Sequence, residues 1–189
     1  MSNFPIFLSL ENKKILVIGA GNIALRRINN LLEFTKNITI LSEEFSQDIN
    51  FLINKYNLTK INRKYEKKDI LDFHMVICAV NNLELQENIY FESRNTHILY
   101  NCVDFQKYCD FYFPTFLKEG DLTLAISTNG ASPAFSKNLK EYLKKILPND
   151  VDKFLSKMKE LRQTLPKGEK RMSELRNRVS EYFEKSFKL

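Results

Sequence analysis

The fold of this chain is decided by the stretch KKILVIGAGNIALRR, residues 13–27. Its apolar first half is typical of a buried strand, and its second half has the polar and apolar spacing of a helix. Between the two, Gly19, Gly21 and Ala24 match the pattern G-x-G-x-x-G/A. The first glycine permits a tight turn, the second lets the backbone approach a pyrophosphate, and the small third residue allows close packing. The flanking strand and helix favour dinucleotide binding over a purely structural turn.

Outward from this turn, strands and helices alternate as far as residue 104. The runs at 14–18 and 75–80 are continuously apolar, which is typical of strands covered on both faces. The other strands are expected at 38–41, 60–65 and 98–103, and the helices at 23–34, 45–56 and 83–95. This alternation predicts an α/β fold, a Rossmann-type doubly wound parallel sheet.

The pattern changes after residue 110. Two strand-like stretches, 111–117 and 122–127, flank the turn signal KEGD and predict a hairpin. Ser132 is placed to cap a helix that has Pro133 at its first position and ends near residue 147. Two further amphipathic helices are expected at about 150–165 and 169–187.

The net charge of +6 comes entirely from the C-terminal third. After Ala131 there are 15 Lys and Arg against 8 Asp and Glu, whereas residues 1–131 have 14 against 15. This asymmetry indicates an anionic partner, either nucleic acid or a polycarboxylate or phosphate ligand, or else a solvated lysine-rich surface. No apolar run approaches the length of a membrane span, and no secretory signal is recognisable.

The three cysteines, Cys78, Cys102 and Cys109, form no C-x-x-C pair. Their odd number favours free thiols in a reducing cytosol, so the sequence predicts a cytoplasmic protein. The two histidines, His74 and His97, lack the spacing of metal ligands, and no protein metal site is expected.

The group that bonds the ribose of a dinucleotide commonly lies near the end of the second strand. Here Ser42 occupies that place, and Glu43 and Glu44 follow it. Any of the three can bond ribose hydroxyls, although the glutamates also suit the N-terminus of the next helix. No Arg or Lys stands beside them to bind a 2′-phosphate, so NAD is favoured over NADP as cofactor.

Four further motifs carry a family resemblance: ICAVNN (77–82), NCVD (101–104), CDFYFP (109–114) and AISTNGASP (125–133). With the glycine turn, their order and spacing over residues 4–147 resemble the precorrin-2 dehydrogenase family. That family includes the dehydrogenase/ferrochelatase half of siroheme synthase. Two positions depart from its pattern, because Val80 stands where threonine is frequent and Asn129 replaces a common glycine.

The resemblance implies a domain plan and a reaction. The plan is an NAD-binding domain at 1–113, a dimerisation segment at 114–147 and a helical C-terminal domain at 148–189, assembled as a homodimer. The reaction is the NAD-dependent oxidation of precorrin-2 to sirohydrochlorin, followed in some members by insertion of Fe²⁺ to give siroheme. Neither nucleic acid nor a membrane is expected as a partner.

Asp104 is the candidate catalytic residue. It follows a strand at the edge where open α/β sheets bind ligands, and it matches the family aspartate implicated in catalysis; a turn residue is the alternative. The expected cofactor residues are Gly19, Gly21, Asn22, Ile23, Ser42, Glu43, Glu44 and Asn81. The expected substrate residues are Asn101, Thr128, Asn129, Ser132 and Lys137. The alternatives are turn formation at Asn101, helix capping at Ser132 and a solvated lysine-rich surface at Lys137.

Two other classes of function compete with this hypothesis. One is a non-catalytic NAD-sensing regulator whose basic helices bind nucleic acid, although no helix-turn-helix is recognisable. The other is a structural Rossmann protein that has lost its nucleotide.

Overall fold

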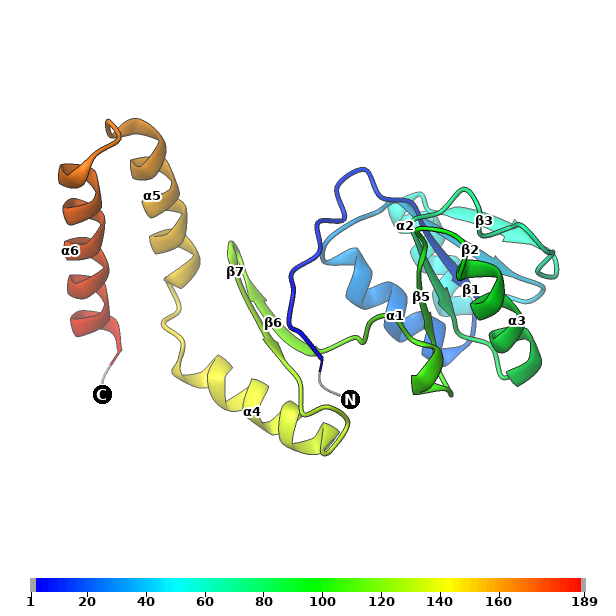
Figure 1. Cartoon of the computed structure of the whole chain (residues 1–189). Coiled ribbons are helices and arrows are strands. Elements are labelled where there is room, and N and C mark those ends of the chain that lie inside the picture. Colours follow the sequence, from blue (N-terminus) through cyan, green and yellow to red (C-terminus); the bar gives the residue numbers. More distant parts are fainter. Residues whose placement is uncertain (1–2, 188–189) are drawn as a thin grey trace. The chain divides into compact units, whose positions relative to one another are not determined.

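The structure is a computed structural model that describes residues 3–187 (Figure 1). It divides into two compact units, one formed by residues 5–112 and the other by residues 113–187 with Asn3 and Phe4. The three-part division expected from the sequence, with boundaries after residues 113 and 147, stays a prediction.

The first unit is built on a five-stranded parallel sheet in the order β3-β2-β1-β4-β5. Its strands are β1 (Ile15–Ile18), β2 (Ile38–Ser42), β3 (Thr59–Asn62), β4 (Met75–Cys78) and β5 (Leu99–Cys102). The first strand pairs with β2 on one side and with β4 on the other, so the winding of the chain reverses there. Open α/β sheets bind their ligands outside the carboxyl ends of the strands at such a point. The predicted Rossmann-type sheet is confirmed.

Three helices connect these strands: α1 (Asn22–Leu32), α2 (Gln47–Tyr56) and α3 (Leu83–Ser93). The last two begin with side-chain caps, because Ser46 accepts a hydrogen bond from the Ile49 N–H and Asn82 accepts one from the Leu85 N–H. In contrast, the cap position of α1 is Gly21, which has no side chain to bond the first N–H groups. The first N–H groups of α1 are therefore left for water or a ligand.

Some predicted strand ends are wrong by a few residues. The third strand was expected at 60–65 but ends at Asn62, because its partner β2 ends at Ser42, the residue paired with Asn62. The stretch from residue 111 was expected to be strand, yet pairing begins only at Thr115. The carbonyl of Phe111 instead accepts a hydrogen bond from Asn101.

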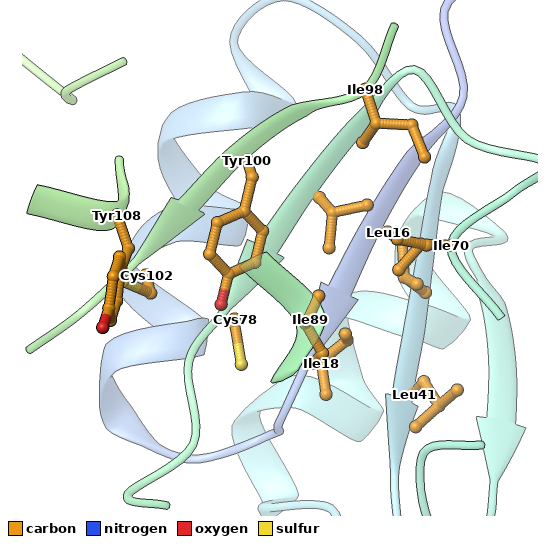
Figure 2. Packing of buried hydrophobic residues seen from close by; sticks show 11 residues of the cluster. Leu16, Ile18, Leu41, Ile70, Cys78, Ile89, Ile98, Tyr100, Cys102 and Tyr108 are labelled. Atoms are coloured by element: carbon orange, nitrogen blue, oxygen red, sulfur yellow. The ribbon is translucent and has the colours of Figure 1, made fainter. Parts of the chain in front are cut away.

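A hydrophobic core joins the sheet to α3 (Figure 2). Ile89 of α3 and Tyr100 of β5 are fully buried with Leu16 and Cys78 of the neighbouring strands. Each such side chain contributes about 1.5–3 kcal/mol by leaving water. This packing fixes α3 against β4 and β5, and therefore fixes the loops at the carboxyl ends of these strands.

The second unit has an antiparallel hairpin of β6 (Thr115–Glu119) and β7 (Leu122–Ile126), as predicted. Ser132 caps the following helix through the Phe135 N–H, and Pro133 is its first residue, which is also as predicted. The helices of this unit are α4 (Pro133–Ile146), α5 (Val151–Thr164) and α6 (Glu169–Ser186). The last two lie side by side (Figure 1), with the rings of Phe154 and Tyr182 stacked 3.8 Å apart.

The second unit buries few side chains. Among its described residues only Leu117, Ser136, Val151 and Leu175 are buried, whereas α4 exposes Phe135, Tyr142 and Ile146. Within residues 3–187, no helix is both long enough and apolar enough to cross a membrane.

Candidate active site

The site is centred on the glycine turn between β1 and α1. Gly19 has a φ of 101°, a backbone conformation that favours glycine, and its N–H donates to the Leu41 carbonyl over 2.8 Å. A Cβ at Gly19 would lie 2.6 Å from the Ala79 carbonyl oxygen, so the backbone that follows β4 leaves no room for a side chain there. A Cβ at Gly21 would meet no protein atom within 4 Å. The space beside Gly21 is therefore open to a ligand at the uncapped start of α1, where Asn22 and Ile23 lie.

A cavity of about 540 Å³ opens beside this turn, at the carboxyl ends of β1, β2 and β3. Four of the predicted cofactor residues line it, namely Gly19, Ser42, Glu43 and Glu44. The other lining residues are Ile18, Leu41, Arg63, Lys64, Tyr65, Val80, Asn82 and Leu85. A ribose and its adenine fit a cavity of this size, with carboxylates at one side to bond the hydroxyls.

Of the two asparagines after β4, only Asn82 lines the cavity. Its side chain also caps α3, so its position is fixed by the helix start. Asn81, the residue predicted to bind cofactor, is exposed and does not line the cavity. The sequence motif places both residues at the strand end, but the direction of each side chain depends on where the helix begins.

Two basic residues stand in the cavity wall, which corrects the expectation that none is near the ribose site. Arg63 and Lys64 follow β3, the strand that pairs with the end of β2. Arg63 donates to both carboxylate oxygens of Asp69 over 2.7 Å, and this guanidinium holds the pKa of Asp69 below its usual value. Lys64 Nζ lies 3.7 Å from Glu43 Oε1 in an exposed ion pair. The sequence signal was the basic run NRK after the third strand, twenty residues away in the chain.

Asp104 lies in the exposed loop after β5, held by a buried glutamine of α3. Gln86 Nε2 donates to Asp104 Oδ2 over 2.5 Å and to the Val80 carbonyl over 2.8 Å. The Asp104 N–H in turn donates to Gln86 Oε1 over 3.4 Å. Because Val80 lines the cavity, this network joins the Asp104 carboxylate to the wall of the cofactor site.

Sequence reasoning missed Gln86. The buried positions of α3 are Gln86, Ile89 and Ser93, which follow helical spacing along one face. A glutamine on the apolar face of a helix is unusual, because a buried amide is costly unless its hydrogen bonds are made. This polar residue at an apolar position of the helix was the sequence signal that could have identified Gln86.

Asn101, expected to bind substrate, is buried at the end of β5. Its Nδ2 donates to the Phe111 carbonyl, while its Oδ1 has no hydrogen-bond partner among the described residues. The amide therefore helps to hold the chain where it leaves the sheet, and its part in substrate binding stays a prediction.

The other expected substrate residues lie in the second unit. Thr128 Oγ1 accepts from the Ser132 N–H, and Ser132 caps α4. Asn129 has a φ of 51°, in the left-handed region that glycine adopts readily and asparagine tolerates. Lys137 is exposed on α4. Three of these side chains thus shape the loop and the helix start, and substrate contact stays a prediction for all four.

The loop that carries Asp104 is bounded by two thiols. Cys102 Sγ and Cys109 Sγ lie 3.8 Å apart, and both cysteines are free. Burial raises the pKa of the Cys109 thiol to about 11. Among residues 3–187 no group of three His, Cys, Asp or Glu side chains is placed to hold a metal ion.

The sheet order, the glycine turn and the cavity define an NAD(P)-binding protein of the Rossmann class. In agreement, residues 6–115 match an NAD(P)-binding family model, and residues 119–145 match the model of the sirohaem biosynthesis protein central domain. A precorrin-2 dehydrogenase of Bacillus subtilis is 30% identical over 159 residues, which are 84% of this chain and 98% of that protein. The chain belongs to the precorrin-2 dehydrogenase family.

Two further comparisons agree. The solved structure of SirC, a precorrin-2 dehydrogenase, superimposes with a TM-score of 0.83 at 26% identity, covering 97% of this chain and 93% of that one. The siroheme synthase of Baumannia cicadellinicola is 31% identical over 148 residues, 78% of this chain. The chain spans about a third of the length of that siroheme synthase, since the match covers 32% of it.

Proposed function

We propose that this protein oxidises precorrin-2 to sirohydrochlorin with NAD⁺ as the hydride acceptor. Family membership supports the reaction, and one structural observation carries the mechanism: the Asp104 carboxylate is tied through Gln86 to Val80 in the cavity wall. The balanced reaction converts precorrin-2 and NAD⁺ into sirohydrochlorin, NADH and a proton. The rival hypothesis of a nucleic-acid-binding regulator finds no support in the relatives, which are biosynthetic enzymes.

The residues around the glycine turn fit a dinucleotide. The start of α1 has no side-chain cap and a Cβ at Gly21 would meet no protein atom within 4 Å, so the first N–H groups of this helix suit a pyrophosphate. Ser42 and Glu43 line the cavity where the adenosine ribose would lie. When bound there, NAD⁺ supplies the hydride acceptor, and the protein's part is to orient it and to receive the proton.

We favour NAD⁺ over NADP⁺ even though two basic residues line the cavity. The Arg63 guanidinium is already bonded to both oxygens of Asp69, so its charge is compensated within the protein. Lys64 is paired with Glu43, and a 2′-phosphate approaching that lysine would also approach the Glu43 carboxylate. A ribose hydroxyl, in contrast, can donate to Glu43 without repulsion.

Asp104 is the base of this proposal. Loss of a hydride leaves an oxidised tetrapyrrole that must release a proton, and a carboxylate in reach of the ring can accept it. Gln86 bonds to Asp104 Oδ2 and to the Asp104 N–H, and Asp104 itself is exposed. The carboxylate is therefore held from one side and open to substrate at the surface of its loop.

The substrate of this proposal carries acetate and propionate groups, and basic side chains attract it. Lys137, Lys140, Lys144 and Lys145 on α4 belong to the basic C-terminal third. Sirohydrochlorin is the product, and Fe²⁺ insertion into it is a further step that we include in the proposal. Any metal insertion would rely on Asp104 and the nitrogens of the tetrapyrrole, since no protein metal site is expected.

A homodimer in the cytoplasm completes the proposal. The second unit exposes Phe135, Tyr142 and Ile146 on α4 and buries few side chains of its own. A two-fold interface over α4 and the β6–β7 hairpin would cover this apolar surface. Sedimentation should show a dimer at micromolar concentration, and a monomer under those conditions would contradict this assembly.

The experiment is an anaerobic incubation of the protein with precorrin-2 and NAD⁺, followed by Fe²⁺. Absorbance spectra should show sirohydrochlorin together with NADH in the first stage. Any acceleration of siroheme formation over a protein-free control in the second stage would report chelation. Absence of NADH formation would contradict the dehydrogenase proposal.

A further inference from the structure

Gln86 is a fully buried side chain whose every hydrogen-bonding group is used. Its Nε2 donates to the Val80 carbonyl and to Asp104 Oδ2, and its Oε1 accepts from the Asp104 N–H. An amide has two N–H donors, so both are spent in this network. A buried amide without hydrogen bonds destabilises the folded protein. The side chain therefore keeps this arrangement, because any other would leave some of its groups unbonded.

The orientation of this amide is determined by its neighbours. Both groups that receive hydrogen bonds from Nε2, a carbonyl and a carboxylate, can only accept, unless the carboxylate is protonated. A half-turn of the amide would place Oε1 against those two acceptors and Nε2 against the N–H of Asp104. This flipped orientation is therefore repulsive at all three contacts. The amide accordingly keeps Nε2 directed at the Asp104 carboxylate.

The backbone of Gln86 is fixed as well. Its N–H donates to the Asn82 carbonyl over 3.0 Å within α3, and its carbonyl accepts from the Tyr100 hydroxyl over 2.8 Å. Tyr100 is fully buried on β5, two residues before the end of that strand. The glutamine is thus held by its helix, by β5 and by the loop after β4, so its side chain is a rigid support.

We propose that Gln86 is a positioning residue that aims the Asp104 carboxylate at the substrate. The inference rests on the proposed dehydrogenation. By holding Oδ2 and the backbone of Asp104 together, Gln86 restricts the carboxylate to one direction on an otherwise exposed loop. The same amide holds Val80, so the base and the cofactor wall keep a constant separation.

The first test is the variant Gln86→Met, which keeps the length of the side chain and removes its hydrogen bonds. We expect kcat for precorrin-2 oxidation to fall about 10- to 100-fold, the loss typical of a misaligned catalytic group. The Kd for NAD⁺ should change far less than kcat, because Gln86 does not line the cavity and contacts its wall only through the Val80 carbonyl. An unchanged kcat in the folded variant would overturn the proposal.

Ser93→Ala is the matched control. Ser93 is buried on the same face of α3, two helical turns further on, and it bonds Tyr90 and Arg94 instead of Asp104. Its loss should lower the melting temperature while kcat stays unchanged. Equal losses of kcat in Ser93→Ala and Gln86→Met would indicate a general effect of destabilisation and would contradict positioning.

A double-mutant cycle with Asp104→Ala separates the two roles. If Gln86 acts through Asp104, then Gln86→Met should not lower kcat any further in a protein that already lacks the Asp104 carboxylate. A full additional loss of kcat in the double variant would show that Gln86 acts on its own. If Gln86→Met does not fold, Gln86→Asn carries the same test, because it keeps the amide but withdraws it by one methylene.

A structural measurement tests the positioning role of Gln86 independently of the proposed dehydrogenase activity. Hydrogen exchange in residues 103–109 should be faster in Gln86→Met than in Ser93→Ala, whether or not precorrin-2 is the substrate. Wild-type protein without dehydrogenase activity would contradict the proposed function. Equal exchange in the two variants would contradict the support that Gln86 gives to Asp104.

Discussion

Gly19 and Gly21 stand two residues apart in one turn, yet they face opposite surroundings. A Cβ added to Gly19 would lie 2.6 Å from the Ala79 carbonyl oxygen, whereas one added to Gly21 would meet no protein atom within 4 Å. The first glycine is thus required by the sheet, and the second is required only by whatever binds there. A side chain at Gly21 should therefore affect ligand binding without affecting the fold, so substitution of this glycine tests cofactor binding directly.

Replacement of Gly21 by valine should abolish tight NAD⁺ binding in a protein that still folds. Its φ of −94° is open to any residue, so the backbone need not change. Loss of one or two hydrogen bonds to the pyrophosphate corresponds to roughly 10- to 100-fold or more in Kd. Isothermal titration of NAD⁺ together with a melting curve measures both effects.

Gly19→Ala is the contrasting variant. It places a side chain on a residue with a positive φ and against the Ala79 carbonyl after β4, so its melting temperature should fall clearly even without ligand. If Gly21→Val kept wild-type affinity for NAD⁺, the site would lie elsewhere.

Removal of the Asp104 carboxylate tests the proposed base. Asp104→Ala should lower the rate of dehydrogenation by about 10²–10⁴-fold, the usual contribution of general-base assistance. Binding of NAD⁺ and the oligomeric state should persist, since Asp104 does not line the cavity. Single-turnover absorbance spectra under anaerobic conditions give the rate of the chemical step.

Asp104→Asn distinguishes a base from an orienting group. The amide oxygen of asparagine can still accept from Gln86 Nε2, but the side chain cannot take up a proton at neutral pH. We expect this variant to be nearly as slow as Asp104→Ala. Activity close to wild type would make Asp104 an orienting residue, and near-normal activity of the alanine variant would leave it a turn residue.

The pair of Glu43 and Lys64 should control the choice between NAD⁺ and NADP⁺. Glu43→Ala removes an acceptor for the ribose and the repulsion of a 2′-phosphate, so the preference for NAD⁺ should fall roughly tenfold. Titration of both nucleotides into each variant reports the ratio of the two Kd values. Lys64→Ala should leave the affinity for NAD⁺ nearly unchanged.

One result would contradict the predicted preference for NAD⁺. Wild-type protein that binds NADP⁺ more tightly, and loses that preference in Lys64→Ala, would show that the lysine reads the 2′-phosphate. The proposed cofactor would then be NADP⁺.

Alkaline conditions should destabilise the first unit through Cys109. Burial raises the pKa of this thiol to about 11, whereas in the unfolded chain it is about 8.5. Between these values the unfolded state releases the proton and the folded state retains it, so stability falls as the pH rises from about 8.5 towards 11. Below about pH 8.5 both states keep the proton and this thiol has no effect.

Melting temperatures measured across that range, under reducing conditions, test the assignment. The decline for wild type should be steeper than for Cys109→Ala, which has no thiol to titrate at that position. Parallel declines in the two proteins would assign the alkaline effect to other groups.

Much of the fold could be predicted from the sequence, because its signals are local. The run ILVI, the two glycines after it and the alternation of strands and helices each depend on neighbours within about fifteen residues. The Ser132–Pro133 helix start was equally local, since a cap and its first turn span four residues. Strand ends could not be predicted as closely, because the end of β3 at Asn62 depends on where its partner β2 ends.

The chemistry present at each strand end could be read from the sequence: the glycine turn, the acidic residues after β2 and Asp104 after β5. Which of these groups meet depends on how the strands pair and how the helices pack. Parallel pairing of β2 with β3 brings Lys64 to Glu43, and packing of α3 on β5 brings Gln86 to Asp104. These partners are separated by about twenty residues in the chain, and the contacts exist because burial of the apolar faces fixes the register of strands and the position of the helix.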